Sequence, residues 1–174
     1  MKPRADTRVA LIGFGYAGRV FHAPLIAATP GLTLAVIGSR QQKSVGSTYP
    51  GVEIVSDPLA AVRHRDVDLV VIATPNDTHA PLAEAALRAG KHVVVDKPFT
   101  ITLAEARALA VRAAEVERLL SVFQNRRWDS DFSGIKQELA AGRIGEVVEF
   151  RSEFSRYRPE VRDRWRERPG PGSG

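Results

Sequence analysis

Three glycines near the N-terminus have the spacing that a phosphate-binding turn requires. Gly13, Gly15 and Gly18 form the pattern G-x-G-x-x-G directly after the apolar run Val9–Ile12. The first glycine makes a tight turn, the second lets backbone N–H groups approach a phosphate, and the third lets the next helix pack closely. The pattern predicts a dinucleotide pyrophosphate site, and the alternative is an ordinary glycine turn. The residues expected at this site are Gly13, Phe14, Gly15, Tyr16, Ala17 and Gly18.

The second apolar run ends without the acidic residue that many dinucleotide sites have. An Asp or Glu about 20 residues after the glycines binds the ribose 2′-hydroxyl of NAD(H). Here the position holds Ser39 and Arg40, with Lys43 nearby. A hydroxyl and a guanidinium suit a 2′-phosphate, because Arg can donate two parallel hydrogen bonds to phosphate oxygens. The sequence therefore favours NADP(H) over NAD(H). The alternative is a solvated basic loop, with NAD(H) bound through backbone contacts.

Polar residues also follow the fourth apolar run, Asp68–Ala73. Loops at the carboxyl ends of parallel strands line the crevice in which a cofactor binds. We expect side chains of this loop to hydrogen-bond the dinucleotide, and the alternative is that Asn76 or Asp77 only caps the next helix. The residues expected at the cofactor are Ala73, Thr74, Pro75, Asn76 and His79.

A lysine follows the fifth apolar run in the sequence Asp96-Lys97-Pro98. Proline restricts the backbone here, and a part-buried lysine gives up its proton more readily, which suits acid–base work at a substrate hydroxyl or carbonyl. Lys97 is the candidate catalytic residue, and Asp96 and Lys97 are expected beside the cofactor. A surface lysine without such a role is the alternative. After the sixth run, Asn125 and Arg126 are expected to meet phosphate or a polar substrate.

The elements that position these residues alternate along the chain. Continuous Val/Ile/Leu runs suit parallel strands that are buried on both faces, and alternation with helices predicts a right-handed, doubly wound α/β sheet of the Rossmann type. The expected strands are Val9–Gly13, Leu32–Gly38, Glu53–Val55, Asp68–Ala73, His92–Val95 and Leu119–Phe123. The expected helices are Ala17–Thr29, one that Asp57-Pro58 begins, His79–Ala89 with Gly90 after it, and Leu103–Arg118 with a Thr102/Glu105 capping box.

The pattern changes after residue 123. We expect Trp128 in a core, and Asp129 and Asp131 as caps of the helix Asp129–Ala141 rather than as a carboxylate pair. Gly145–Arg158 alternates apolar and polar residues, which predicts a long strand buried on one face. Residues 1–123 are thus expected to form a nucleotide-binding domain, and residues 124–174 the beginning of an incomplete α+β domain for substrate binding or oligomerisation. An unpaired strand edge favours pairing with another chain, hence a homo-oligomer.

Composition narrows the classes of protein. The 174 residues include no cysteine, which excludes disulfides, thiolate metal sites and a cysteine nucleophile. His22, His64, His79 and His92 lack the spacing of metal ligands, so no metal is expected, and His22 and His64 are interpreted as structural or solvated. The net charge of +5 is spread along the chain, which argues against nucleic-acid binding. No apolar run of membrane-spanning length is present, and a cytoplasmic protein is expected.

Taken together, these segments resemble the Gfo/Idh/MocA family, named after glucose–fructose oxidoreductase, inositol dehydrogenase and their relatives. The matching motifs are Gly13-Phe14-Gly15-Tyr16-Ala17-Gly18, Ala73-Thr74-Pro75-Asn76-Asp77-Thr78-His79, Asp96-Lys97-Pro98 and Gln124-Asn125-Arg126-Arg127-Trp128-Asp129. The family's usual tripeptide is Glu-Lys-Pro, and the shorter Asp96 keeps its charge.

The resemblance implies an NAD(P)-dependent oxidoreductase that transfers hydride between nicotinamide C4 and a carbon bearing a hydroxyl or carbonyl on a sugar, cyclitol or related compound. It gives Lys97 the role of contacting substrate and moving a proton, and it places Trp165 and Arg166 near the cofactor. The family's later Asp-x-x-x-His pattern, whose histidine is a partner of the lysine, does not occur in these 174 residues. Little dehydrogenase activity is therefore expected from this chain alone, and a non-catalytic NADP(H)-binding or sensing module is the alternative.

Overall fold

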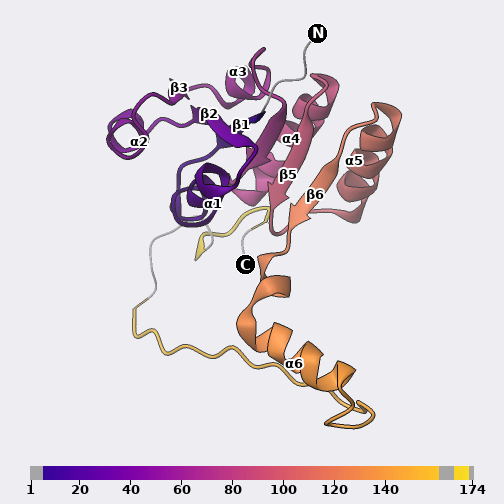
Figure 1. Cartoon of the computed structure of the whole chain (residues 1–174). Helices are drawn as coiled ribbons and strands as arrows, with labels where there is room; N and C mark the ends of the chain where they lie inside the picture. The colour runs from indigo at the N-terminus through magenta and orange to yellow at the C-terminus, as the bar shows by residue number, and fades with distance from the viewer. Residues whose placement is uncertain (1–5, 161–166, 173–174) are drawn as a thin grey trace.

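Six parallel strands form the centre of the computed structural model, which describes residues 6–160 and 167–172 (Figure 1). The order across the sheet is β3-β2-β1-β4-β5-β6, so the chain reverses its direction of travel between β1 and β4. At such a switch point the loops on the two sides diverge and leave room for a ligand. The strands are β1 (Thr7–Ile12), β2 (Leu32–Gly38), β3 (Glu53–Val55), β4 (Leu69–Ile72), β5 (His92–Asp96) and β6 (Leu120–Phe123).

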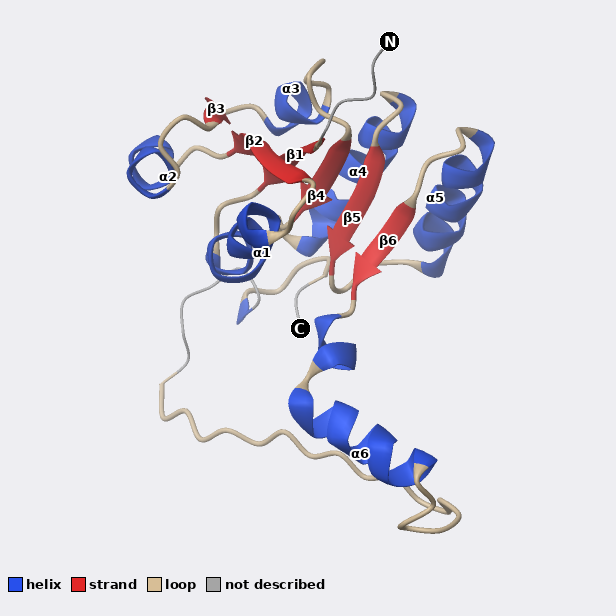
Figure 2. Ribbon diagram, in the orientation of Figure 1, coloured by secondary structure: helices blue, strands red, loops and turns tan. Residues whose placement is uncertain are grey.

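Helices cover both faces of the sheet, as Figure 2 shows. The helical elements are η1 (Gly18–His22), α1 (Ala23–Ala28), α2 (Gln42–Thr48), α3 (Pro58–Val62), η2 (Asn76–Thr78), α4 (His79–Arg88), α5 (Leu103–Glu115), η3 (Asn125–Trp128) and α6 (Ser130–Ala140). Side chains of β1 alternate between two cores, as the two-residue period of a strand requires. Ala10 and Ile12 pack with residues of α3, α4 and α5, whereas Val9 and Leu11 pack with residues of α1 and α2. The predicted doubly wound fold is confirmed.

Two helices, α3 and α5, begin at the capping residues that the sequence pattern predicted. The Asp57 carboxylate accepts hydrogen bonds from the backbone N–H groups of Leu59 and Ala60 at the start of α3. Thr102 and Glu105 form the reciprocal capping box of α5. One helix was missed, because α2 has no side-chain cap and carries Ser, Gly and Thr residues with low helix propensity. Its single buried residue, Val45, anchors it against the core.

A strained residue ends helix α5 and provides a stability prediction. The Arg118 N–H donates to the Ala113 carbonyl and the Glu117 N–H to the Ala114 carbonyl, which is the Schellman arrangement. The residue that takes the left-handed backbone conformation in this motif is Glu117, with φ of 52°. At the corresponding position after α4 the residue is Gly90. Because a side chain disfavours this backbone region, Glu117→Gly should raise the free energy of unfolding by about 1 kcal/mol. Urea denaturation measures the change, and an equal or lower stability would contradict it.

The segment after β6 leaves the sheet, and one expectation about it is wrong. Helix α6 extends away from the sheet in Figure 1, and the chain that follows it turns back along the helix and passes below the sheet. Residues 147–158 form no strand, and the apolar side chains Val148, Phe150 and Phe154 are exposed. The alternating pattern is present, but no described strand lies beside it to supply hydrogen bonds or a covering layer. The predicted half-buried strand is therefore an exposed, unpaired segment here.

None of the helices among the described residues combines the length and the apolar character that crossing a membrane would need.

Candidate cofactor site

The predicted site residues follow the carboxyl ends of the strands, which lie along one edge of the parallel sheet. The glycine turn follows β1, Ser39 follows β2, and Thr74 follows β4. Lys97 follows β5 and Asn125 follows β6. The topology therefore brings together segments that are far apart in the sequence. β1 and β4 pair in register from Val9 with Leu69 to Ile12 with Ile72, which places their two following loops side by side.

The glycine turn is packed where it must be and open where a ligand would need room. Gly13 has φ of +98°, and an added Cβ would lie 2.5 Å from the Ala73 carbonyl oxygen. At Gly18 an added Cβ would lie 2.1 Å from the Gly13 carbonyl oxygen. At Gly15, in contrast, an added Cβ would meet nothing within 4 Å. The outer two glycines thus close the turn, and Gly15 leaves open space at the edge of the sheet, which fits the close approach of a pyrophosphate.

Only the backbone of Phe14 can contribute to that space. Its side chain is 3% exposed and packs edge-on against Tyr49, with ring centroids 6.1 Å apart. Tyr16 is exposed and packs edge-on against Phe21. The expected helix after the turn begins as a π-helix, η1, before it becomes α1. Single π turns of this kind frequently occur at functional sites.

The contrast between the glycines gives a second prediction. Gly15→Ala should keep the fold, because its methyl group meets no protein atom, and should weaken binding of NADPH about tenfold by occupying ligand space. Gly46→Ala is the matched control, because Gly46 lies in α2 and its added Cβ would make only one ordinary contact. Fluorescence titration measures both affinities. Unchanged binding by the Gly15→Ala variant would show that no ligand approaches this turn.

The end of β2 presents a hydroxyl and an exposed guanidinium. Ser39 is 9% exposed, and its Oγ accepts a hydrogen bond of 3.0 Å from the Gln41 N–H. This bond leaves the hydroxyl hydrogen of Ser39 free to be donated elsewhere. Arg40 and Lys43 are exposed, and Lys43 lies in the first turn of α2. Positive charge is therefore available beside the glycine turn, since the Gly13 N–H donates to the Gly38 carbonyl.

The loop after β4 is held together by its own hydroxyl and imidazole groups. The Oγ1 atoms of Thr74 and Thr78 lie 2.6 Å apart, and the Thr78 hydroxyl donates to the Pro75 carbonyl. Asn76 is 7% exposed and donates from Nδ2 to the Gly172 carbonyl at 2.6 Å. Neither Asn76 nor Asp77 caps α4 with its side chain, so the capping alternative is excluded.

His79 is almost fully enclosed, at 1% exposure. Its Nδ1 lies 2.8 Å from the carbonyl oxygen of Pro98, and its Nε2 lies 2.9 Å from the carbonyl oxygen of Thr74. Both ring nitrogens therefore face backbone. The imidazole joins the loop after β4 to the loop after β5, and it has no nitrogen left to offer to a ligand.

The lysine lies on the open side of this edge. Lys97 is exposed, not part-buried as expected, because it lies beyond the end of β5 where no described element covers it. Its peptide bond to Pro98 is cis. Its N–H donates a hydrogen bond of 2.7 Å to Asp96 Oδ1. Burial raises the pKa of the Asp96 carboxyl, but the His22 imidazole and the Lys97 N–H lower it more, so that this pKa lies below its ordinary value.

The residues after β6 are more exposed than their pattern indicated. Arg126 donates to Asp129 at 2.6 Å, and this carboxylate raises the pKa of the guanidinium. Asp129 occupies the N-cap position of α6 without a capping hydrogen bond, so its expected role as a side-chain cap is wrong. Trp128 is 84% exposed, so the expected core position is also wrong. Asn125 is half-buried in η3. Trp165 and Arg166, the remaining predicted cofactor residues, lie outside the described residues.

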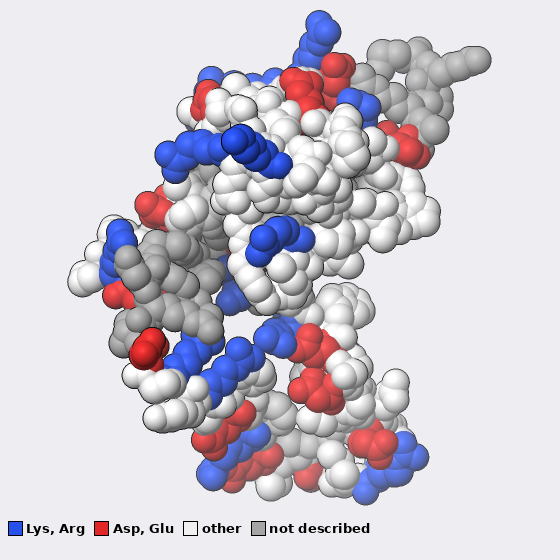
Figure 3. Space-filling view, turned by 90° about the vertical axis from the view of Figure 1, so that its left-hand side faces the viewer, with Lys and Arg blue, Asp and Glu red and all other residues white. Residues whose placement is uncertain are grey.

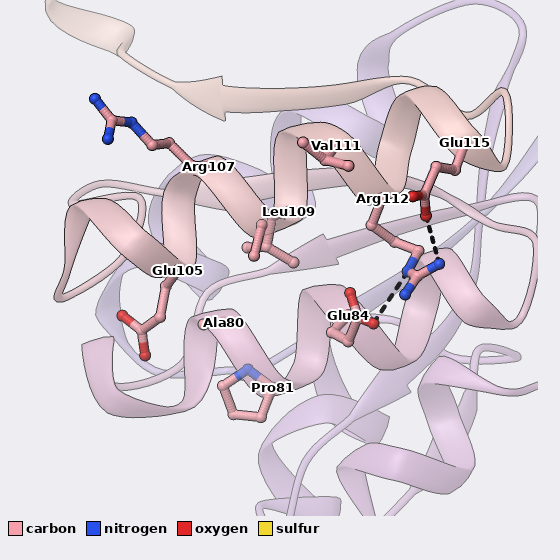
Figure 4. A pocket seen from close by; sticks show the side chains of 10 residues that line it. Ala80, Pro81, Glu84, Glu105, Arg107, Leu109, Val111, Arg112 and Glu115 are labelled. Atoms are coloured by element: carbon pink, nitrogen blue, oxygen red, sulfur yellow. Dashed lines mark hydrogen bonds and ion pairs between the residues drawn. The ribbon is translucent and has the colours of Figure 1, made fainter.

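A separate hollow of about 660 Å³ lies between α4 and α5 (Figure 4). Arg112 lies in it between Glu84 and Glu115, with N–O distances of 3.2 and 2.5 Å. These ion pairs involve three of the five charged residues that line the hollow, and none of the predicted site residues lines it. Within residues 6–160 and 167–172, no group of His, Asp and Glu side chains is arranged to hold a metal ion. On the face that Figure 3 shows, Lys and Arg are interspersed with Asp and Glu.

The strand order, the switch point and the glycine turn define a dinucleotide-binding domain of the Rossmann class. The sequence model of the oxidoreductase family Gfo/Idh/MocA, described as an NAD-binding Rossmann fold, matches residues 7–124. The chain belongs to this family.

Relatives with known sequences and structures agree with this assignment. The Escherichia coli oxidoreductase YdgJ is 60% identical over 169 residues, covering 97% of this chain and 49% of YdgJ. The Bacillus subtilis protein IolW, named scyllo-inositol 2-dehydrogenase (NADP(+)), is 36% identical over 98% of this chain and 48% of its own length. The crystal structure of the B. subtilis oxidoreductase yvaA superposes with a TM-score of 0.91 at 36% identity, over 98% of this chain and 49% of that protein. The chain thus spans about half the length of these relatives.

One feature near the glycine turn was missed by the sequence analysis. His22, interpreted there as structural or solvated, is 4% exposed and faces the Asp96 carboxylate. The available signal is its spacing, because His22 follows Gly18 by four residues and so lies on the same side of the helix. Gly18 packs against the turn, which places that side toward the sheet.

Proposed function

We propose that this chain is the cofactor-binding half of an oxidoreductase that transfers hydride between NADP(H) and a carbon bearing a hydroxyl or carbonyl on a cyclitol or sugar. The proposal rests mainly on one observation, which is that three candidate groups lie at the same edge of the sheet. The open Gly15 turn, the Ser39–Arg40 pair and the exposed Lys97 follow three different strands there. NADP(H) supplies the hydride when bound. The relative IolW is named scyllo-inositol 2-dehydrogenase (NADP(+)), which supports the preference for NADP(H).

Each group at this edge has a distinct task in the proposal. Backbone N–H groups of the turn after Gly13, up to Gly18, bind the pyrophosphate at the start of η1, while the Gly13 N–H stays bonded to the Gly38 carbonyl. Ser39 and Arg40 bind the 2′-phosphate by donating hydrogen bonds to its oxygens. Ala73, Thr74 and Pro75 line the crevice, and Asn76 and His79 fix the shape of that loop.

Lys97 acts on the substrate rather than on the cofactor alone. A lysine ammonium carries three donors on a flexible stem, so it can hydrogen-bond the substrate oxygen and exchange a proton with it as hydride moves. In the oxidation direction the neutral amine form of Nζ takes the hydroxyl proton and becomes the ammonium, and in the reduction direction the ammonium gives a proton to the developing alkoxide. Asp96, Asn125 and Arg126 flank this position along the same edge. A homo-oligomeric, cytoplasmic enzyme remains our prediction.

A chimera tests the proposal directly. Residues 1–174 are joined to the part of the E. coli relative that follows its aligned region. The reduction of NADP+ by scyllo-inositol, myo-inositol and a panel of sugars is then followed by NADPH absorbance. The unmodified relative is assayed in parallel, and NADPH titration shows that the chimera has a formed site. Turnover with any of these polyols supports the proposal. A chimera that binds NADPH and turns over none of the compounds that the relative accepts would favour a non-catalytic binding module.

A further inference from the structure

Two buried histidines act on the aspartate that precedes Lys97. His22 comes from η1, next to the glycine turn, and is 4% exposed. His79 begins α4 and is 1% exposed. Both contribute favourable electrostatic interactions to the Asp96 carboxylate. Groups from η1 and α4 therefore act electrostatically on the one carboxyl group that ends β5.

The geometry of His22 points to Asp96 as its partner. Its Nε2 lies 3.7 Å from Asp96 Oδ2, which is longer than a hydrogen bond, and no described atom accepts a hydrogen bond from it. An unpaired buried nitrogen costs free energy, and a small shift of the carboxylate would satisfy it. The ring of Phe123 fixes the imidazole from the β6 side, with ring centroids 4.4 Å apart.

The second oxygen of the same carboxylate holds Lys97. The Lys97 N–H donates to Asp96 Oδ1 at 2.7 Å. On the far side of the lysine, the Pro98 carbonyl oxygen lies 2.8 Å from His79 Nδ1. The backbone around Lys97 is thus held before and after the residue, while its side chain stays free and exposed. The carboxylate therefore has one oxygen bonded to the lysine backbone and the other facing the imidazole of η1 at 3.7 Å.

We propose that His22 is a positioning residue that holds Lys97 in place through the Asp96 carboxylate. The importance of this arrangement for catalysis rests on the proposed function of Lys97, but the contact can be tested without turnover. His22 is the link by which the cofactor turn and the lysine loop share one side-chain contact. The titratable side chains that act on the Asp96 carboxyl are those of His22 from η1 and His79 from α4, whereas Lys97 contributes its backbone N–H.

The test uses the isotope-labelled 174-residue chain and two variants at position 22. His22→Phe keeps a ring against Phe123 but removes the N–H, and His22→Gln restores a donor. His64→Phe is the control, because His64 lies elsewhere in the fold. Its Nε2 faces Glu53, with an N–O distance of 3.2 Å. NMR measures the titration of the Asp96 carboxyl carbon and the hydrogen exchange of the Lys97 amide. The circular-dichroism spectrum and NADPH binding report whether each variant is folded.

We expect His22→Phe to raise the pKa of Asp96, since burial remains while the favourable imidazole is lost. The Lys97 amide should exchange about tenfold faster, the change expected when a hydrogen bond to a charged group is weakened. His22→Gln should reverse most of both effects, and His64→Phe should cause neither. An unchanged Asp96 titration and Lys97 amide in His22→Phe would overturn the proposal.

A further variant keeps the proposal testable if His22→Phe does not fold. Asp96→Asn retains the size of the side chain, and the ring-nitrogen shifts of His22 are then compared with those in Asp77→Asn, an exposed position of η2. A changed His22 spectrum in Asp96→Asn alone supports the contact, and equal spectra refute it. A Lys97 variant with full turnover would overturn the catalytic role of the lysine and leave these NMR results unaffected.

Discussion

Replacing Lys97 by alanine in the chimera should reduce kcat by about 10²- to 10⁴-fold, the usual contribution of a positioned acid–base group. Binding of NADPH should change little, because the exposed side chain makes no hydrogen bond with any described residue of the turn that would hold the phosphates. The loss should therefore appear in turnover and not in cofactor affinity. Stopped-flow assays and fluorescence titration on the same preparation separate the two quantities.

Two controls distinguish loss of a proton-transfer group from loss of a positive charge. Lys97→Arg keeps the charge but cannot give up its proton in this pH range, so it should remain as impaired as the alanine variant. Lys91→Ala removes a lysine at the opposite end of the same strand, where Nζ donates to the Val67 carbonyl, and should keep turnover close to that of the parent. Full activity of Lys97→Ala would remove this residue from the mechanism.

Replacing Arg40 by serine should weaken NADPH binding by about ten- to a hundredfold, the contribution of charge-assisted hydrogen bonds to one phosphate. Binding of NADH should stay unchanged, since NADH lacks the 2′-phosphate that the guanidinium would contact. The preference for NADPH in the unmodified chain should also decline as salt concentration rises, because Arg40 is exposed and its charge is screened.

Arg107→Ser is the control for this change. Arg107 is exposed on α5, and its guanidinium points away from the other residues drawn in Figure 4. Its removal alters the net charge by the same amount at a distance from the end of β2. If both variants lowered NADPH affinity equally, the effect would come from overall charge and not from a 2′-phosphate contact.

The parallel sheet could be predicted because its signals are local. Runs such as Leu69–Ile72 are apolar at every position, which is typical of a strand covered on both faces, and the observed β4 is buried almost throughout. Asp57 and Thr102 cap helices through hydrogen bonds that span two or three residues, so the sequence pattern contains the whole interaction. The strand-to-turn transition at Gly13 was equally local.

Features that depend on distant partners could not be obtained in this way. Residues 147–158 have the alternation of a strand, but strand formation requires a neighbour to hydrogen-bond, and no described segment provides one. Trp128 was expected in a core on the basis of its residue type, yet it lies beyond the end of the sheet. His22 and Asp96 face each other from separate elements. A local sequence pattern does not contain information about such a pair.

The most direct test of the account is a fluorescence titration of the unmodified 174-residue chain with NADPH and, separately, with NADH. The account predicts saturable binding of both, with NADPH bound at least about tenfold more tightly, because Ser39 and Arg40 add contacts to the 2′-phosphate. Equal affinity for the two cofactors would contradict the Ser39–Arg40 assignment. Absence of binding would contradict the claim that the open turn at Gly15 is a formed dinucleotide site.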